Sequence, residues 1–483
     1  MRTMKHPTPT RSAVRYAAAP AFTMPWHELR VLYVFQALAS GALAGTVCLT
    51  HDWACGIALH FVVVVTSMGI CIWYYPGLIM RSDPYVALSF LMWMDVAFAL
   101  QWLGVDSEAI RLQTMLRLAV MSLVAFSFMC LGMCCRFPPV RRAAGDAKAR
   151  QVRRVLIAAF ICIAMSAPLR LYSNHITNPL SRPLPLYVLY YPLLAAVPGA
   201  ALAAIAFARR RTITTGTLSV FSFGIVLLDS SRRAFVTLVC ILVCTLLQRA
   251  AERGYSKRIF RSLLLKCTVI GMVVYCVAAA RRSYNRSDRT WGSFQKEFAG
   301  FAGRARAQAL IPDFAFTVEA YPQRAPHLWG STILSLLVNP VPRRWWSGKP
   351  IGMSAIVAYN RMGLMTPSDY AHQWGDLPSI HSFSPSFVAE MWANFGWVGI
   401  VAGSFLLTVL YRALEALNDI RKTGILWPLY TGSLLSAVIV QNRGCFLTAN
   451  FFPLCAVVIG TLALVVAHRV DSFGSRGRLP EAS

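Results

Sequence analysis

Charged residues are scarce in this chain, and acidic residues are the scarcest of all. Charged side chains make up 14% of the 483 residues, against about 25% in an average soluble domain. Hydrophobic residues reach 56%, which excludes a disordered basic chain and makes a soluble enzyme a poor fit. Only 20 Asp and Glu oppose 47 Lys and Arg, a net charge of +27. A nucleic-acid binder would explain the charge but not the apolar excess, so the composition predicts a membrane protein with basic loops.

Short catalytic and metal-binding motifs are also missing. The 13 Cys lie nearly all in apolar runs, and no CxxC pair has a second CxxC or HxxxH to complete a zinc site. There is no Walker A, HExxH, GxSxG or DxD pattern. The sequence therefore disfavours nucleotide hydrolysis, gives little support to metal catalysis and predicts no cofactor.

About twelve apolar runs have the character of membrane-spanning helices, which need about 20 residues for a bilayer core of ~30 Å. The runs lie at 31–48, 55–73, 85–104, 117–135, 155–171, 186–208, 216–229, 234–248, 264–280, 396–415, 424–441 and 449–467. The short seventh and eighth runs are separated here because an Arg pair at the bilayer midplane is unfavourable. The predicted fold is all-α, with about 12 transmembrane helices and one long external loop that holds short helices.

Basic residues are distributed unevenly between the loops. With the N-terminus in the cytoplasm, the inside segments carry 27 Lys and Arg, and the short outside loops carry 6. This is the positive-inside bias of a membrane protein. The predicted divisions are these: basic cytoplasmic tail 1–30, helices 1–9 in 31–280, outside loop 281–395, helices 10–12 in 396–467, and cytoplasmic tail 468–483.

The long loop 281–395 is rich in aromatic residues and is positively charged. Phe294, Phe298 and Phe301 have the spacing of a helix with one apolar face, as in helices that lie at a membrane surface. Twelve Lys and Arg accompany seven Asp and Glu, on the side where the positive-inside rule requires no positive charge. A loop of this length is usually functional. Its charge fits an anionic ligand or anionic lipid headgroups.

Five cations are candidate anion-binding residues: Arg232, Arg233, Arg343, Arg344 and Lys349. The last three lie in the stretch 341–350, where prolines and a glycine restrict the backbone and two tryptophans suit the membrane interface. The first two lie in a tight turn between short spans. Guanidinium groups match phosphate oxygens with two hydrogen bonds, and Lys adds a point charge. For both groups, a structural role at the membrane interface is the alternative.

Glu390 is the candidate general base or acid. It lies six residues before the apolar run at 396, and desolvation there favours a neutral carboxyl group that can exchange a proton. A favourable contact with a helix dipole is the alternative role. His381 is the second catalytic candidate, although a loop histidine more often has no catalytic role. Asp95, inside a span, is either a proton-linked group or a residue paired within the bundle.

Several segments together resemble a known family, the bacterial Wzy-type O-antigen polymerases, also called oligosaccharide repeat-unit polymerases. The segments are Ser231-Arg232 between two spans, Trp329-Gly330-Ser331-Thr332, Asn339-Pro340-Val341-Pro342-Arg343, Lys349-Pro350, and Ser386 to Gly396 with Glu390 and Asn394-Phe395-Gly396. The resemblance covers roughly residues 215–415. Each motif is loose, and their order and location carry the likeness.

The resemblance implies a metal-independent glycosyltransferase at the outer face of the bacterial cytoplasmic (inner) membrane. It would join polyprenyl-diphosphate-linked oligosaccharide repeat units into an O-antigen, capsule or exopolysaccharide. Cations such as the five named above would stabilise the leaving diphosphate, with Glu390 as the preferred base and His381 as the runner-up. A chain-length regulator and a flippase are the implied partners, with no nucleic acid.

Three other functions fit parts of the sequence. The related O-antigen ligase shares the helical bundle and the cationic outer loop. A lipid-linked glycan flippase or other transporter suits twelve spans with both termini inside, but transporters usually show repeated halves and midplane charges. A glycosyltransferase that uses polyprenyl-phosphate sugars would place its acids in an early outside loop, and Asp106 and Glu108 are its only support.

Overall fold

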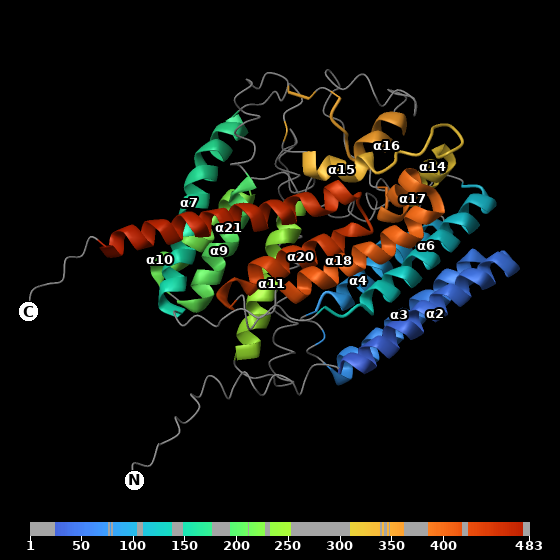
Figure 1. Cartoon of the computed structure of the whole chain (residues 1–483), viewed down its shortest axis with the longest axis horizontal. Helices are drawn as coiled ribbons and strands as arrows, with labels where there is room; N and C mark the ends of the chain where they lie inside the picture. The colour runs from blue at the N-terminus through green and yellow to red at the C-terminus, as the bar shows by residue number, and fades with distance from the viewer. Residues whose placement is uncertain are drawn as a thin grey trace, which may run out of the picture.

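The computed structural model describes most of the chain as helices connected by short segments (Figure 1). The residues described are 25–75, 78, 81–103, 110–137, 148–175, 194–210, 212–227, 232–252, 310–338, 341, 345–346, 348–361, 385–417 and 424–476. No strand occurs among these residues. The described part of the chain is therefore all-α, as its composition predicts.

The first half of the chain contributes mostly long helices. They are α2 (Trp26–Thr50), α3 (Trp53–Tyr74), α4 (Asp83–Phe90), the π-helical turn η3 (Leu91–Asp95), α5 (Val96–Trp102), α6 (Leu112–Met133), α7 (Lys148–His175), α9 (Ala196–Arg209), α10 (Ile213–Leu227) and α11 (Arg232–Glu252).

The second half combines three short helices with a further group of long ones. They are α14 (Leu310–Ala320), α15 (Ser331–Val338), α16 (Met353–Arg361), α17 (Phe387–Val398), the π-helical turn η6 (Gly399–Gly403), α18 (Ser404–Leu417), the 3₁₀ turn η7 (Gly424–Leu426), α20 (Trp427–Gln441) and α21 (Phe446–Arg476).

Eight helices in the described part of the chain are long and apolar enough to cross a membrane. They correspond to the predicted runs one to five and ten to twelve. The sixth, seventh and eighth runs form the shorter apolar helices Ala196–Arg209, Ile213–Val226 and Ala234–Ala250. The ninth run, 264–280, lies outside the described residues. The chain thus has the helices of a multi-pass membrane protein, and the full number of twelve spans stays a prediction.

The long helices connect two distinct ends of the bundle. Helices α11 and α20 are antiparallel, because Thr237 bonds to Ser436 at 2.8 Å and Gln248 donates to the Gly424 carbonyl at 2.6 Å. Helices α14, α15 and α16 lie together beside α17 (Figure 1). We call this the loop end. It also holds the start of α6, since Thr114 donates to Glu319 of α14 at 2.9 Å.

A buried charge cluster closes the opposite end, which we call the tail end. Arg412 of α18 donates to Asp83 of α4 at 3.2 Å and also to Glu415. Arg81 donates to Asp83 at 2.7 Å, and both guanidinium groups lie over the Trp26 ring of α2. Burial lowers the pKa of Arg81, but the neighbouring carboxylates outweigh it and raise that pKa above its ordinary value. The predicted tail 1–30 and two further segments that the charge count puts inside, 74–84 and 412–423, thus contribute residues to one end of the bundle.

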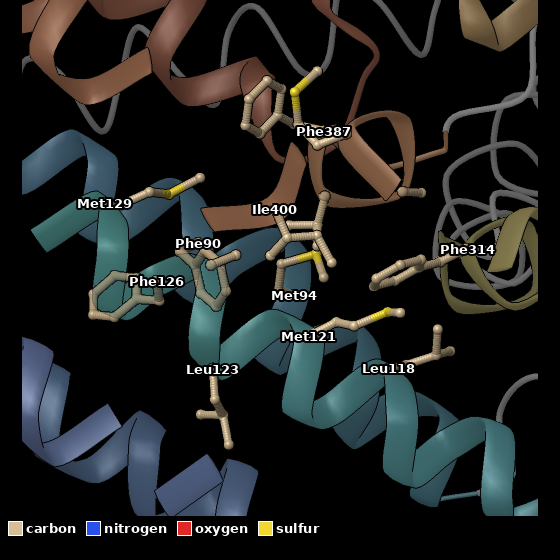
Figure 2. Close-up of a cluster of buried hydrophobic side chains, with 14 of the residues drawn as sticks. Phe90, Met94, Leu118, Met121, Leu123, Phe126, Met129, Phe314, Phe387 and Ile400 are labelled. Carbon is tan, nitrogen blue, oxygen red and sulfur yellow. The ribbon is translucent and has the colours of Figure 1, made fainter. Parts of the chain in front are cut away.

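The interior near the loop end is apolar and joins the short helices to the bundle. Figure 2 shows Phe314 of α14 directed toward Leu118 and Met121 of α6, with Phe387 of α17 in the same cluster. All four side chains are essentially inaccessible to solvent. Part of the predicted loop therefore packs as core, which holds α14 at a fixed position against α6.

The intramembrane acid Asp95 is paired within the bundle. Its Oδ2 atom lies 2.8 Å from Nδ1 of His60 on α3, and both side chains are buried. The ring of His60 also contacts Phe126 edge-on, with centroids 4.8 Å apart. Asp95 ends the π-helical turn η3, and such a turn widens a helix locally. Of the two roles left open by the sequence, the paired residue is the one observed.

Candidate functional site

Glu390 lies in the first turn of α17, where the sequence favours a helix start. Ser386 is the N-cap, and its hydroxyl accepts from the Ala389 N–H at 3.1 Å. The helix therefore starts nine residues before the predicted apolar run at 396. At that point Gly396 has φ of +61°, a conformation that side chains with a Cβ rarely adopt, and the chain kinks. Glu390 thus stands on a short, separately oriented segment at the loop end.

The carboxyl group of Glu390 caps another helix. Its Oε2 atom accepts a hydrogen bond from the Phe446 N–H, the first residue of α21. A negative group is favourable at a helix N-terminus, where backbone N–H groups lack partners within the helix. The side chain is fully buried, and the hydroxyl group of Thr332 interacts with the same carboxyl group. The carboxyl group is therefore enclosed within the fold and anchored at the start of α21.

Asn394, one turn after Glu390, joins α17 to the segment around Gly330. Its Nδ2 atom donates to Thr332 Oγ1 at 2.7 Å and to the Glu390 carbonyl at 2.8 Å. Its Oδ1 atom accepts from the Gly330 N–H at 2.8 Å. Gly330 has φ of +82°, so its own turn also requires glycine. The two motifs 329–332 and 390–396, about 60 residues apart in sequence, thus form one hydrogen-bonded unit, which we call the Glu390 unit.

His327 belongs to the same unit and was missed by the sequence reasoning, which named His381 as the catalytic candidate among the loop histidines. Its Nδ1 atom lies 3.2 Å from the Ala393 carbonyl, and its ring contacts Trp329 and Trp392 edge-on. The signal was available, because His327 lies two residues before the Trp329-Gly330 motif. His381 lies outside the described residues.

Lys349 is the one predicted cation whose side chain is described. It is 8% exposed, and its Nζ atom donates to the Val341 carbonyl at 2.8 Å. This bond ties the two ends of the predicted cationic stretch together. The following residues pack on the connection that leads into α21, since Ser354 donates to Cys445 Sγ at 3.2 Å. Lys349 is therefore part of the loop end, close in the chain to residues that contact the capped helix.

For the other four predicted cations, the structure gives a backbone position at most. Arg232 and Arg233 are the first residues of α11, and their side chains are not among the parts that the structure describes. Because Thr237 lies opposite Ser436 in an antiparallel pair, the α11 backbone at Arg232 lies near the level of Gln441, which ends α20. That level is also where the chain turns toward Phe446. Arg343 and Arg344 lie outside the described residues.

A cavity of about 530 Å³ lies at the loop end between α6, α14 and the end of α16. Its charged lining residues are Arg111, Arg117, Glu319, Arg324 and Arg361. None of these four arginines is among the site residues that the sequence predicts, and Arg324 and Arg361 are counted there only within the general charge of the loop. No local pattern indicates the cavity, because it is formed by helices about 200 residues apart in the chain.

The cavity and the Glu390 carboxyl group lie on different sides of α17. The Arg117 guanidinium stacks over the Trp392 ring at 4.5 Å, and Trp392 donates to the Tyr321 carbonyl at 2.8 Å. Trp392 follows Glu390 by two residues, which is about 200° around a helix. Helix α17 therefore separates a buried carboxyl group on one side from a cluster of arginines on the other.

The arrangement offers proton exchange and anion binding. Within the described residues, no group of three His, Cys, Asp or Glu is placed to hold a metal ion. Comparisons of the chain with protein-family models, curated proteins and solved structures found no match. A function therefore has to be argued from the residues of the chain and their geometry.

Proposed function

We propose that the protein polymerises polyprenyl-diphosphate-linked oligosaccharide repeat units into a surface polysaccharide by metal-independent glycosyl transfer. The observation that supports this most is the Glu390 unit. It unites two of the segments that carry the family resemblance around a buried carboxyl group. The reaction would take place at the outer face of the bacterial cytoplasmic membrane. Both termini of the protein would lie in the cytoplasm.

The proposed reaction needs one proton acceptor and one site for a leaving anion. The hydroxyl oxygen of the acceptor sugar attacks the anomeric carbon of the donor glycan, and its proton passes to Glu390. The bond from that carbon to the diphosphate oxygen breaks, and its electron pair leaves with the lipid diphosphate. A general base positioned in this way typically accelerates a reaction by about 10²–10⁴-fold.

Cations provide the second element of the proposal. Negative charge grows on the diphosphate in the transition state, and fixed guanidinium groups stabilise it there more than in the ground state. One unit charge pair at 4 Å is worth ~4 kcal/mol at an effective dielectric near 20, as an upper guide. In the proposal this role falls to Arg232, Arg233, Arg343, Arg344 and Lys349. Two or three of them supply several kcal/mol without a metal.

The glycan made by living cells tests the proposal. In a strain without the protein, surface glycan is expected to stop at a single repeat unit, and the wild-type chain is expected to restore a ladder of lengths. Arg343→Ala and Glu390→Ala are expected to insert in the membrane and to leave single units. Normal long ladders from both variants would remove the proposed site.

Extracted lipids separate polymerisation from its alternatives. A polymerase accumulates long glycan on the polyprenyl carrier, so the ladder is lipid-linked and depends on this protein. If the carrier-linked ladder persists without the protein and only its transfer to a final acceptor stops, the ligase function replaces the proposal. If single units stay at the inner face in the absence of the protein, a flippase function replaces the proposal.

A further inference from the structure

We propose that the arginine-lined cavity between α6, α14 and α16 is a binding site for an oxyanion carried by the glycan substrate. The oxyanion is the diphosphate of the lipid carrier or an acidic substituent of a sugar, which share the chemistry that guanidinium groups recognise. The identification of the ligand as a glycan rests on the proposed function. The existence of an anion site rests only on the cavity.

The charge balance of the cavity is the first argument. Four arginines and a single glutamate line it. The glutamate, Glu319, already accepts a hydrogen bond from Thr114 at 2.9 Å. Arg361 already has a carboxylate, since its Nη1 atom bonds to the buried Asp313 at 2.5 Å. Among the described residues, the two acids at the cavity, Glu319 and Asp313, are thus engaged with other groups.

Three of the arginines that line the cavity are paired with no carboxylate among the described residues. In the described part of the chain, Arg111, Arg117 and Arg324 form no ion pair, yet all three line one cavity. Like charges repel, so their convergence is unfavourable unless an anion lies between them. Isolated surface arginines need no such explanation, but three around one concave space do.

Part of the cavity wall is held in place by packing and hydrogen bonds. Arg117 is held by its stacking on Trp392, an interaction of cation and ring that fixes the plane of the guanidinium group. Trp392 is in turn buried and bonded to the Tyr321 carbonyl. Helix α14, which supplies the opposite wall, is anchored through Phe314 in the core shown in Figure 2. A site whose donors are fixed in advance binds with less loss of conformational freedom.

The size of the space fits a part of a glycan. A cavity of about 530 Å³ falls within the range of about 300–1,000 Å³ that is typical of sites for small molecules. Gln113, Thr114 and Gln323 add uncharged donors and acceptors to a lining that also contains apolar residues of α14. Such side chains bind sugar hydroxyl groups, whereas a site for a bare inorganic ion would not need them.

Binding to the purified full-length chain in nanodiscs of zwitterionic lipid tests the inference without any catalysis. Isothermal titration calorimetry would be run with inorganic diphosphate, with a trisaccharide of galacturonic acid and with a neutral galactose trisaccharide. Binding of either anion, with none of the neutral sugar, is the expected result. The anion that binds identifies the source of the charge, and binding of neither anion overturns the proposal.

Variants assign the binding to the cavity. Arg111 and Arg324 are exposed, so Arg111→Gln and Arg324→Gln leave the core untouched. Loss of one charge-assisted hydrogen bond is expected to weaken binding by roughly tenfold to hundredfold. Arg210→Gln removes the same charge from an exposed residue outside the cavity and is expected to bind as the wild type does. Equal affinity in all three variants contradicts the proposal even if the protein proves to be a polymerase.

Discussion

Replacing Glu390 by Gln separates a catalytic carboxyl group from a structural helix cap. Gln keeps the volume of Glu and an oxygen that can accept from the Phe446 N–H, so the α21 start keeps a partner. Only the negative charge at the helix terminus is lost, which is worth roughly 0.3–1 kcal/mol and up to ~2 kcal/mol when partly buried. The variant is therefore expected to fold, and its unfolding temperature is expected to fall slightly.

The polymerising activity of Glu390→Gln is expected to fall strongly. A glutamine cannot take up the acceptor proton, so we expect polymerisation to slow by about 10²–10⁴-fold. Glu390→Ala adds a structural defect, because the partly buried Phe446 N–H is left without its acceptor, at a cost of about 1–3 kcal/mol. The assay pairs the glycan ladder in cells with thermal unfolding of the purified protein. Glu28→Gln, the same change at the partly exposed tail-end residue that accepts from Tyr75, serves as the matched control.

One outcome refutes the reasoning. If Glu390→Gln makes glycan of wild-type length at wild-type expression, the carboxyl group is only a helix cap. The proposed reaction would then lack its base, and His327 would be an alternative within the Glu390 unit, since it contacts the same helix.

Three further changes probe the fold that holds the site. Asn394→Ala removes three hydrogen bonds and strands a backbone N–H, so stability is expected to fall by about 2–4 kcal/mol in chemical unfolding. Gly432→Ala would place a Cβ 2.4 Å from the α11 backbone, whereas Gly45 has no atom within 4 Å. We expect Gly432→Ala to lower stability by about 1–3 kcal/mol or more and Gly45→Ala to be neutral or stabilising, and equal unfolding temperatures would contradict the α11–α20 contact. Arg412→Gln leaves buried carboxylates with one cation fewer and is expected to cost about 3–5 kcal/mol. Arg153→Gln at a 66% exposed side chain is expected to stay within ~1 kcal/mol, so similar losses from both arginine variants would argue against a buried cluster.

The helices could be predicted from the sequence because each depends on a local property. Runs of apolar residues correspond to described helices at eleven of the twelve predicted spans, and the remaining run, 264–280, lies outside the described residues. The predicted start at 396 marks the kink at Gly396 rather than the helix start. The residues from Phe387 onward were assigned to a loop because their polar and charged members interrupt the apolar run, yet they are buried against other parts of the fold.

The site could be predicted only where its residues form short motifs. The segments around Thr332 and Glu390 were recognised separately, but their joining through Asn394 depends on side chains of two elements meeting in space. The arginine cavity could not be anticipated, because α6 and α14 meet through tertiary packing. Spacing along the chain indicates which face of a helix is apolar, but not which distant helix covers it.

Reconstitution with defined substrates tests the central claim most directly. The purified chain in lipid vesicles would be given a polyprenyl-diphosphate-linked oligosaccharide, with a chelator present and no nucleotide. We expect the glycan to lengthen by whole repeat units, with one polyprenyl diphosphate released for each unit added and no release by Glu390→Gln. Movement of the intact lipid-linked unit across the vesicle membrane without bond formation, or equal release by Glu390→Gln, would contradict the account.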